Sequence, residues 1–123
     1  MKKTEVNEAV LKKMKIKAGA SLAVFNLPEG VSVKKPFPPS DGHDAVLAFF
    51  DSKKEFVAGM KKLKKTILKS GSIWAFYKKG NVTDLNRDLI HELAPDFGME
   101  AVSLISLDDV WSSMRVMFPK GSR

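Results

Sequence analysis

The chain of 123 residues contains no cysteine, which excludes disulfide bonds and thiolate metal sites. It has two histidines, His43 and His91, whose separation in the sequence argues against a histidine-based metal centre. No apolar run approaches the roughly 20 residues that a membrane-spanning helix needs. The first ten residues also lack the continuous apolar segment of a secretory signal. We therefore expect a cytoplasmic protein with no metal, no bound cofactor and no membrane partner.

Acidic residues are scarce relative to lysines, and the formal net charge is +7. Residues 1–65 contain 14 lysines and 7 acidic residues, whereas residues 66–123 contain 7 basic and 7 acidic residues. A basic surface attracts phosphate groups, including those of nucleic acids. A solvated lysine-rich surface is the simpler interpretation. The lysine-rich stretch 61–65 has no interleaved aromatic residue, so we expect at most weak nucleic-acid binding.

Short apolar runs predict buried strands, and periodic apolar positions predict amphipathic helices. The expected strands are Ser21–Asn26, Asp44–Phe50, Ser72–Tyr77, Ala101–Ser106 and Ser112–Phe118. The expected helices are Thr4–Lys15, a helix from the N-cap Ser52 to the C-terminal glycine Gly71, and a helix that is capped by Thr83 or Asp84 and ends near Pro95.

The segment between the first two expected strands is irregular. Val31 and Val33 favour a brief edge strand, whereas the prolines at 36, 38 and 39 exclude a helix or a central strand. In the last strand, Val110, Met114, Val116 and Phe118 share parity and are expected to face the core together. We also expect both tryptophans, Trp74 and Trp111, to be packed in the interior.

The order of these elements predicts one α/β domain over residues 1–123. The expected architecture is a minimal Rossmann-like three-layer sandwich. Its mainly parallel sheet of about five strands would carry an antiparallel hairpin at the C-terminal edge.

The stretch Gly71–Asp88 is the strongest candidate for a functional site. It places a buried strand before Lys78 and Lys79, and then a helix start at Thr83 and Asp84. Helix amides and lysines together form a suitable site for an anion. The alternative interpretation is a solvated basic loop beside an ordinary helix cap.

Other candidate ligand-binding residues follow the first two strands. Asn26 and Glu29 lie after the first strand, and Asp51 and Ser52 after the second. If the strands are parallel, these residues reach the edge at which α/β sheets bind ligands. For Asn26 and Glu29, turn formation alone is an equally good explanation. Arg87 lies close to a positive helix end and therefore needs a partner, either Glu29, a bound anion or an ordinary surface ion pair.

The element order resembles the sheet of the class I methyltransferases with its second and third strands removed. In that family a glycine-rich turn follows the first strand, and an acidic residue after the second strand holds the ribose of the cofactor. Here the turn is Asn26–Gly30, which has one glycine and contains Pro28, and the second strand is missing. These departures argue against methyl transfer and against binding of S-adenosylmethionine.

Four segments resemble a family of small, mostly bacterial proteins known only as a domain of unknown function. Lys78 departs from that family, in which proline is common at this position. This resemblance supports the fold and implies no activity. The segments are NLPEG (Asn26–Gly30), GSIWAFYKK (Gly71–Lys79), TDLNRD (Thr83–Asp88) and DDVWSSMR (Asp108–Arg115).

Neither histidine has a serine and a carboxylate at a spacing that suggests a catalytic triad, so we assign no catalytic residue. We expect a non-catalytic binding or regulatory module with a ligand crevice at the carboxyl edge of the sheet. Its partner would be a small anionic or nucleotide-like ligand or another protein. The alternatives are an enzyme that uses a nucleotide-type cofactor and, next, a weak nucleic-acid-associated protein.

Overall fold

The computed structural model describes residues 4–17, 19–33 and 42–122 of the chain. Strands and helices alternate through most of these ranges. In order, they are β1 (Thr4–Val6), α1 (Glu8–Lys13), β2 (Leu22–Phe25), β3 (Val31–Val33), β4 (His43–Phe49), α2 (Lys53–Leu63), β5 (Ile67–Lys78), α3 (Arg87–Leu93), the 3-10 helix η1 (Ala94–Phe97), β6 (Glu100–Ser106), β7 (Trp111–Met117) and the 3-10 helix η2 (Lys120–Ser122).

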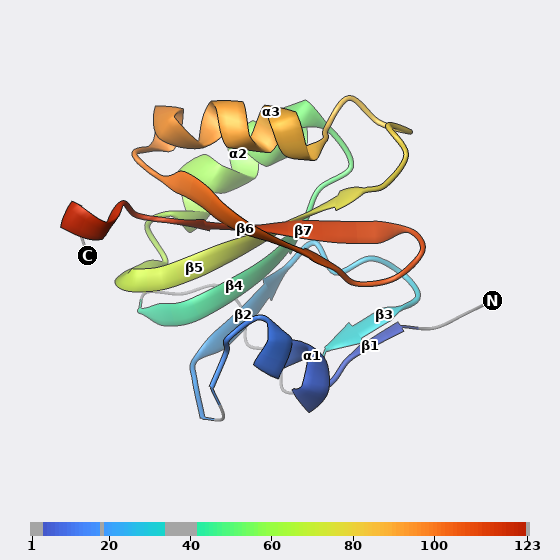
Figure 1. Ribbon diagram of the computed structural model, residues 1–123, viewed down its shortest axis with the longest axis horizontal. Coiled ribbons are helices and arrows are strands. Elements are labelled where there is room, and N and C mark those ends of the chain that lie inside the picture. Colours follow the sequence, from blue (N-terminus) through green and yellow to red (C-terminus); the bar gives the residue numbers. More distant parts are fainter. Residues whose placement is uncertain (1–3, 18, 34–41, 123) are drawn as a thin grey trace.

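Five strands form one mixed sheet in the order β2-β4-β5-β7-β6 (Figure 1). The first three strands run parallel to one another, whereas β7 runs antiparallel to both β5 and β6. The expected α/β architecture, with a parallel core and an antiparallel C-terminal pair, is therefore confirmed. We call the edge at which β2, β4 and β5 end the carboxyl edge, and the opposite edge the amino edge.

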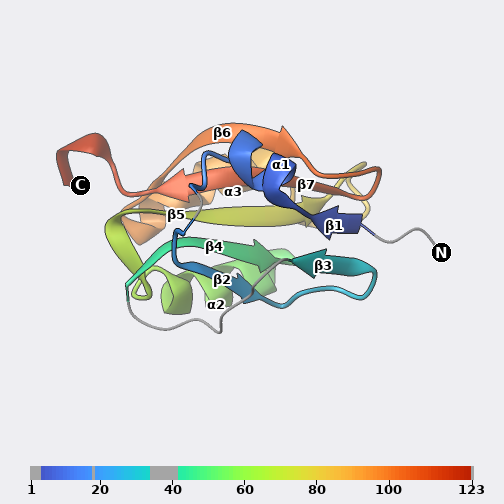
Figure 2. The same cartoon turned by 90° about the horizontal axis from the view of Figure 1, so that it is seen from below.

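Both faces of the sheet are covered, which explains why its central strands are continuously apolar. Helices α2 and α3 lie over one face, and α1 lies over the other together with the two-stranded sheet of β1 and β3 (Figures 1 and 2). Side chains of β4 alternate between the two sides, with Val46 and Ala48 in the core beneath α2 and α3, and Leu47 and Phe49 in the core beneath α1.

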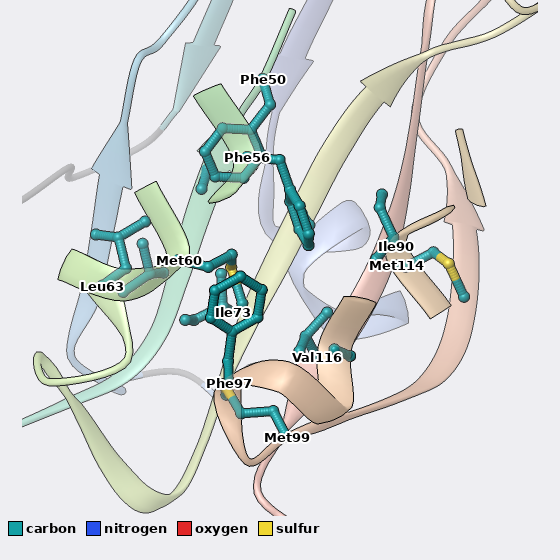
Figure 3. Close-up of a cluster of buried hydrophobic side chains, with 14 of the residues drawn as sticks. Phe50, Phe56, Met60, Leu63, Ile73, Ile90, Phe97, Met99, Met114 and Val116 are labelled. Atoms are coloured by element: carbon teal, nitrogen blue, oxygen red, sulfur yellow. The ribbon is translucent and has the colours of Figure 1, made fainter. Parts of the chain in front are cut away.

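The core beneath α2 and α3 is the larger of the two (Figure 3). Phe56 of α2 contacts Phe50 and Phe97 in edge-to-face geometry, with ring centroids 5.5 and 5.9 Å apart. Gly59 of α2 faces Phe50, and a Cβ there would approach the Phe50 ring to 2.5 Å. The helix therefore packs closely on the sheet, and it fixes where its N-terminus lies.

The expected helix Thr4–Lys15 is wrong at its start. Residues Thr4–Val6 form β1, which pairs in parallel with β3, and α1 begins only after the N-cap Asn7. The brief strand expected at Val31 and Val33 is confirmed as β3. A strand of three residues is stable only with a partner, and β3 supplies that partner from a distant part of the sequence. The prolines at 36, 38 and 39 lie outside the described residues.

The expected C-terminal glycine of the second helix is also wrong. Helix α2 ends at Leu63, whose carbonyl accepts hydrogen bonds from Thr66 Oγ1 at 2.7 Å and from Thr66 N at 2.9 Å. Gly71 instead lies inside β5, where an added Cβ would lie 2.9 Å from the carbonyl oxygen of His43 and 3.0 Å from that of Asp44. Glycine is needed here because the backbone of β4 comes close.

The last expected helix begins two or three residues later than predicted, with Asn86 as its N-cap rather than Thr83 or Asp84. Pro95 lies in the 3-10 turn that follows α3, as expected. Met114 and Val116 are buried in the core, but Val110 precedes β7 and its side chain is exposed. Trp74 and Trp111 are both buried, as predicted.

Candidate functional site

The carboxyl edge collects three loops because its strands are parallel. β2 ends at Phe25, β4 at Phe49 and β5 at Lys78, and the paired residues Phe25↔Ala48 and Phe49↔Phe76 keep these ends in register. The loops with the candidate ligand-binding residues therefore leave the sheet on the same side, as the parallel arrangement predicted.

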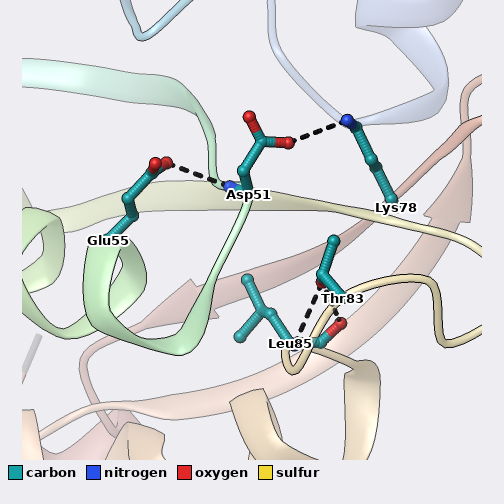
Figure 4. Close-up of polar contacts among 5 residues, drawn as sticks. All are labelled: Asp51, Glu55, Lys78, Thr83 and Leu85. Atoms are coloured by element: carbon teal, nitrogen blue, oxygen red, sulfur yellow. Dashed lines mark hydrogen bonds and ion pairs between the residues drawn. The ribbon is translucent and has the colours of Figure 1, made fainter.

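Asp51 lies at the centre of this edge (Figure 4). Its Oδ1 forms an ion pair with Lys78 Nζ at 3.0 Å, and its backbone N–H donates to Glu55 Oε1 at 3.0 Å. The Lys78 ammonium also lies 5.6 Å from the ring centroid of Trp111, a cation–π distance. Lys78 is therefore held in place between a carboxylate and an aromatic face.

The N-terminus of α2 also lies at this edge, directly after Asp51. Ser52 caps it by accepting the Glu55 N–H at 3.1 Å, as the sequence predicted. The N–H of Lys53 donates to Asp84 Oδ1 at 2.8 Å. Side-chain oxygens of Asp84 and Ser52 thus accept hydrogen bonds from backbone N–H groups in the first turn of α2. The positive end of the helix dipole lies here and favours a negatively charged group. Glu55 bonds the amide before the cap rather than the cap itself, which departs from the expected capping box.

Lys79 points to the β6–β7 connection instead of toward α2. Its Nζ donates to Ser106 Oγ, and its backbone N–H donates to Val110 O at 2.8 Å. It lies close enough to Asp108 to lower the pKa of that carboxyl. The two adjacent lysines therefore contact different parts of the edge: Lys78 contacts Asp51, and Lys79 contacts the end of β6.

Asp108 is a charged residue of this edge that the sequence reasoning did not select. Burial raises the pKa of Asp108, but hydrogen bonds from Thr4, Trp111 and Val110 and the charge of Lys79 outweigh it, so that the pKa lies below its ordinary value of 3.8. The Thr4 hydroxyl donates to Asp108 Oδ2 at 2.6 Å across 104 residues of sequence. The signals for Asp108 in the sequence were its place in the connection between two expected strands and its position at the start of the segment Asp108–Arg115.

Four other candidate residues lie around this centre. Thr83 is not a helix cap; its Oγ1 accepts the Leu85 N–H at 3.1 Å and shapes the loop before α3. Arg87 pairs with its exposed neighbour Asp88 at 3.9 Å, which agrees with an ordinary surface ion pair. Asn26 and Glu29 are exposed in the loop after β2, and Asn26 has a left-handed φ of 57°. A ligand-binding role for these residues stays a prediction.

The amino edge holds a polar cluster that the sequence did not suggest. Ser21 Oγ lies 2.6 Å from Nδ1 of the buried His43, and Asp44 Oδ2 accepts the Ser21 N–H at 2.9 Å. Ser21 precedes β2, while His43 and Asp44 begin β4, so these bonds join the starts of two neighbouring parallel strands. We interpret the cluster as a structural one, whose hydrogen bonds hold the starts of β2 and β4 together.

The described residues contain no group of three or more histidine, aspartate or glutamate side chains arranged to hold a metal ion. None of the helices within these ranges is long and apolar enough to cross a membrane.

Solved structures of methyltransferase-like proteins share this fold. One is LepI in complex with S-adenosylmethionine, with a TM-score of 0.55 and 10% identity over 96% of this chain and 43% of that one. Another is the ribosomal protein L11 methylase of Lactobacillus delbrueckii subsp. bulgaricus, with a TM-score of 0.51 and 11% identity over 96% and 71% of the two chains. A third is described as a pericyclic reaction enzyme, with a TM-score of 0.50 and 11% identity over 96% and 43%.

No protein-family model matches the chain, and no curated protein matches it in sequence. The chain spans 43% of the length of the LepI chain that it resembles. At this low identity the likeness concerns the fold alone. The methyltransferase-like architecture expected from the sequence is therefore confirmed, whereas the resemblance to the small bacterial family stays a prediction.

Proposed function

We propose that the chain is a non-catalytic binding or regulatory module that takes up an anionic group at the carboxyl edge of its methyltransferase-like sheet. One observation carries this proposal: the Lys78 ammonium and the positive end of α2 meet at Asp51, 3.0 Å from Lys78. Asp51 holds the place that the anionic group of a ligand would take. The ligand class is a small anion, a nucleotide-like molecule or an acidic group of a protein partner.

A methyltransferase reaction has less support at this edge. β2 is the last strand of the described sheet on its side, so no neighbouring strand carries an acidic residue for a cofactor ribose. The turn Asn26–Gly30 contains Pro28, which has no N–H to donate to a ligand. An enzyme that uses a nucleotide-type cofactor is thus the weaker candidate.

The proposal predicts competition between Asp51 and an added anion. Titration of the ¹⁵N-labelled protein with inorganic phosphate should shift the amide signals of residues 51–55 with a dissociation constant on the order of millimolar. The substitution Asp51→Asn should tighten this binding by about three- to tenfold, because Lys78 loses its internal partner. Lys78→Ala should weaken it by a similar factor. A matched control is Lys65→Ala, which removes a charge beyond the far end of α2.

Two outcomes would overturn the proposal. One is an equal phosphate affinity of the wild type and the Asp51→Asn variant. The other is an equal loss in the Lys78→Ala and Lys65→Ala variants, which would show only a general effect of net charge. Lys78→Ala should also cost about 0.5–1 kcal/mol of unfolding free energy through its contact with Trp111, so all variants are compared well below their unfolding transitions.

A further inference from the structure

A groove of about 680 Å³ lies along α2 and ends at the loop before α3. This volume falls within the roughly 300–1,000 Å³ of typical ligand sites. Neither Asp51 nor Lys78 lines the groove, so it is separate from the proposed anion site. The lining residues are Lys53, Lys54, Val57, Ala58 and Lys61 of α2 and Asp84 of the loop.

The floor of the groove is apolar and accessible to solvent. Helix α2 buries Phe56, Met60 and Leu63 in the core, and on another side of the helix Ala58 is exposed and Val57 is half-buried. Val57 and Ala58 both line the groove. A bound molecule can therefore contact these two side chains, and covering them removes apolar surface from water.

The lysines of the groove follow the helical repeat. Lys54 and Lys61 are seven residues apart and therefore lie on the same side of α2, with Val57 and Ala58 between them. At a rise of 1.5 Å per residue, the Cα atoms of the two lysines are roughly 10 Å apart. The groove thus presents a short apolar strip with an exposed lysine at each end.

The charge of the groove is positive. Lys53, Lys54 and Lys61 contribute three positive charges, whereas Asp84 contributes one negative charge. Asp84 Oδ1 accepts the backbone N–H of Lys53 at 2.8 Å, which ties the loop before α3 to the start of α2. An occupant with two carboxylates and an apolar group between them complements this arrangement.

The composition of the groove favours a protein segment over nucleic acid. None of its six lining residues is aromatic, whereas the bases of single-stranded nucleic acids stack on aromatic side chains. A phosphate backbone would pair with the lysines and leave Val57 and Ala58 uncovered. An aliphatic side chain covers these two residues, and a protein supplies it together with carboxylates.

We propose that the groove binds an acidic segment of a partner protein. Two carboxylates of the segment pair with Lys54 and Lys61, and an aliphatic side chain between them packs on Val57 and Ala58. Exposed ion pairs contribute little by themselves, so the apolar contact is needed to make the binding selective.

The test is an NMR titration of the ¹⁵N-labelled protein with the peptide acetyl-Glu-Ser-Leu-Ser-Glu-amide. Alternate residues of an extended peptide share one side, so the leucine lies between the two glutamates. We expect saturable shifts of the amide signals of residues 53–61, with a dissociation constant on the order of millimolar. Replacing the leucine by serine, or both glutamates by glutamine, should weaken binding at least about fivefold.

Two pairs of lysines provide matched variants. Lys54→Gln combined with Lys61→Gln removes the cations at both ends of the apolar strip and should weaken peptide binding about three- to tenfold. Lys65→Gln combined with Lys69→Gln removes equal charge from exposed residues that do not line the groove. This second variant should leave peptide binding within about twofold.

Four results would overturn the proposal. The first is the absence of shifts at residues 53–61 up to about 10 mM peptide, ten times the dissociation constant of a millimolar site. The second is equal binding of the peptide without leucine, which would show attraction by charge alone. The third is an equal loss in the two double-lysine variants. The fourth is equal or tighter binding of a thymidine trinucleotide, which has the same charge as the peptide and would favour nucleic acid as the partner.

Discussion

Three aspartates at the carboxyl edge have partners within the chain: Asp51 forms an ion pair, and Asp84 and Asp108 accept hydrogen bonds. Their charges oppose those of Lys78 and Lys79, so the edge is much less positive than its lysines alone imply. The sequence identified Asp51 and Asp84 from their positions after a strand and before a helix. It could not show that each is already paired, because the partners are a strand-end lysine and a backbone amide of a different segment.

The carboxylate of Asp108 provides a prediction about pH. Because the folded pKa of Asp108 lies below 3.8, this group stabilises the folded protein above that pH, and the contribution is lost as the pH falls through the folded value. Thr4→Val removes the hydroxyl that donates to Asp108 at 2.6 Å. We expect the pKa of Asp108 to rise in this variant, measured by ¹³C NMR titration of its carboxyl carbon.

Thr83→Val is the control, since Thr83 has no part in the hydrogen bonds of Asp108 and should leave its pKa unchanged. An unchanged pKa of Asp108 in the Thr4→Val variant would contradict the role given to Thr4. It would mean that the backbone amides of Val110 and Trp111 and the charge of Lys79 suffice to lower the pKa.

The strands of the sheet were predictable and the ends of the helices were less so. β2 and β4 contain short apolar runs with turn residues beside them, and β7 carries Met114 and Val116 at positions of the same parity; local pattern identifies both kinds of strand well. The helical pattern of Phe56, Met60 and Leu63 continues to Ile67, although Ile67 begins β5. A strand that pairs with β4 competes with the helix there, and this long-range pairing is not visible in a local pattern.

β5 provides a prediction at Gly71. In Gly71→Ala the new methyl group would lie 2.9–3.0 Å from three backbone carbonyl oxygens, those of His43, Asp44 and Leu68. Backbone atoms of paired strands cannot move aside easily, so we expect a loss of about 2 kcal/mol or more in unfolding free energy. Urea denaturation measures it.

The control for Gly71→Ala is Gly121→Ala, because no atom outside its neighbours lies within 4 Å of a Cβ at Gly121. That substitution should change stability by less than about 0.5 kcal/mol. A Gly71→Ala variant as stable as the wild type would show that β4 and β5 separate more readily than this packing implies.

The basic surface of the whole molecule is concentrated on and after α2, where Lys61, Lys62 and Lys65 are exposed. Lys62 is also engaged within the fold, with Nζ 5.6 Å from the ring centroid of Phe25. We expect weak binding to duplex DNA without sequence preference, falling by roughly a decade or more between 50 and 200 mM salt. Fluorescence anisotropy at several salt concentrations measures this.

Sub-micromolar DNA binding at about 150 mM salt would contradict this expectation, since sequence-independent contacts give much weaker binding at physiological salt. Loss of that binding when Lys61, Lys62, Lys64 and Lys65 are replaced together by alanine would show that these lysines form the DNA-binding surface. The nucleic-acid interpretation of the chain would then replace the binding of a small anion.

The fold is shared with LepI, which was solved in complex with S-adenosylmethionine, and this raises the question of whether the chain also binds that molecule. Isothermal titration calorimetry with S-adenosylmethionine tests this directly, because we propose that this protein binds a ligand without transferring a methyl group. With Pro28 in the turn after β2 and no described strand beyond β2, we predict no measurable binding at millimolar cofactor. Saturable binding with a micromolar dissociation constant would contradict the account and favour an enzyme.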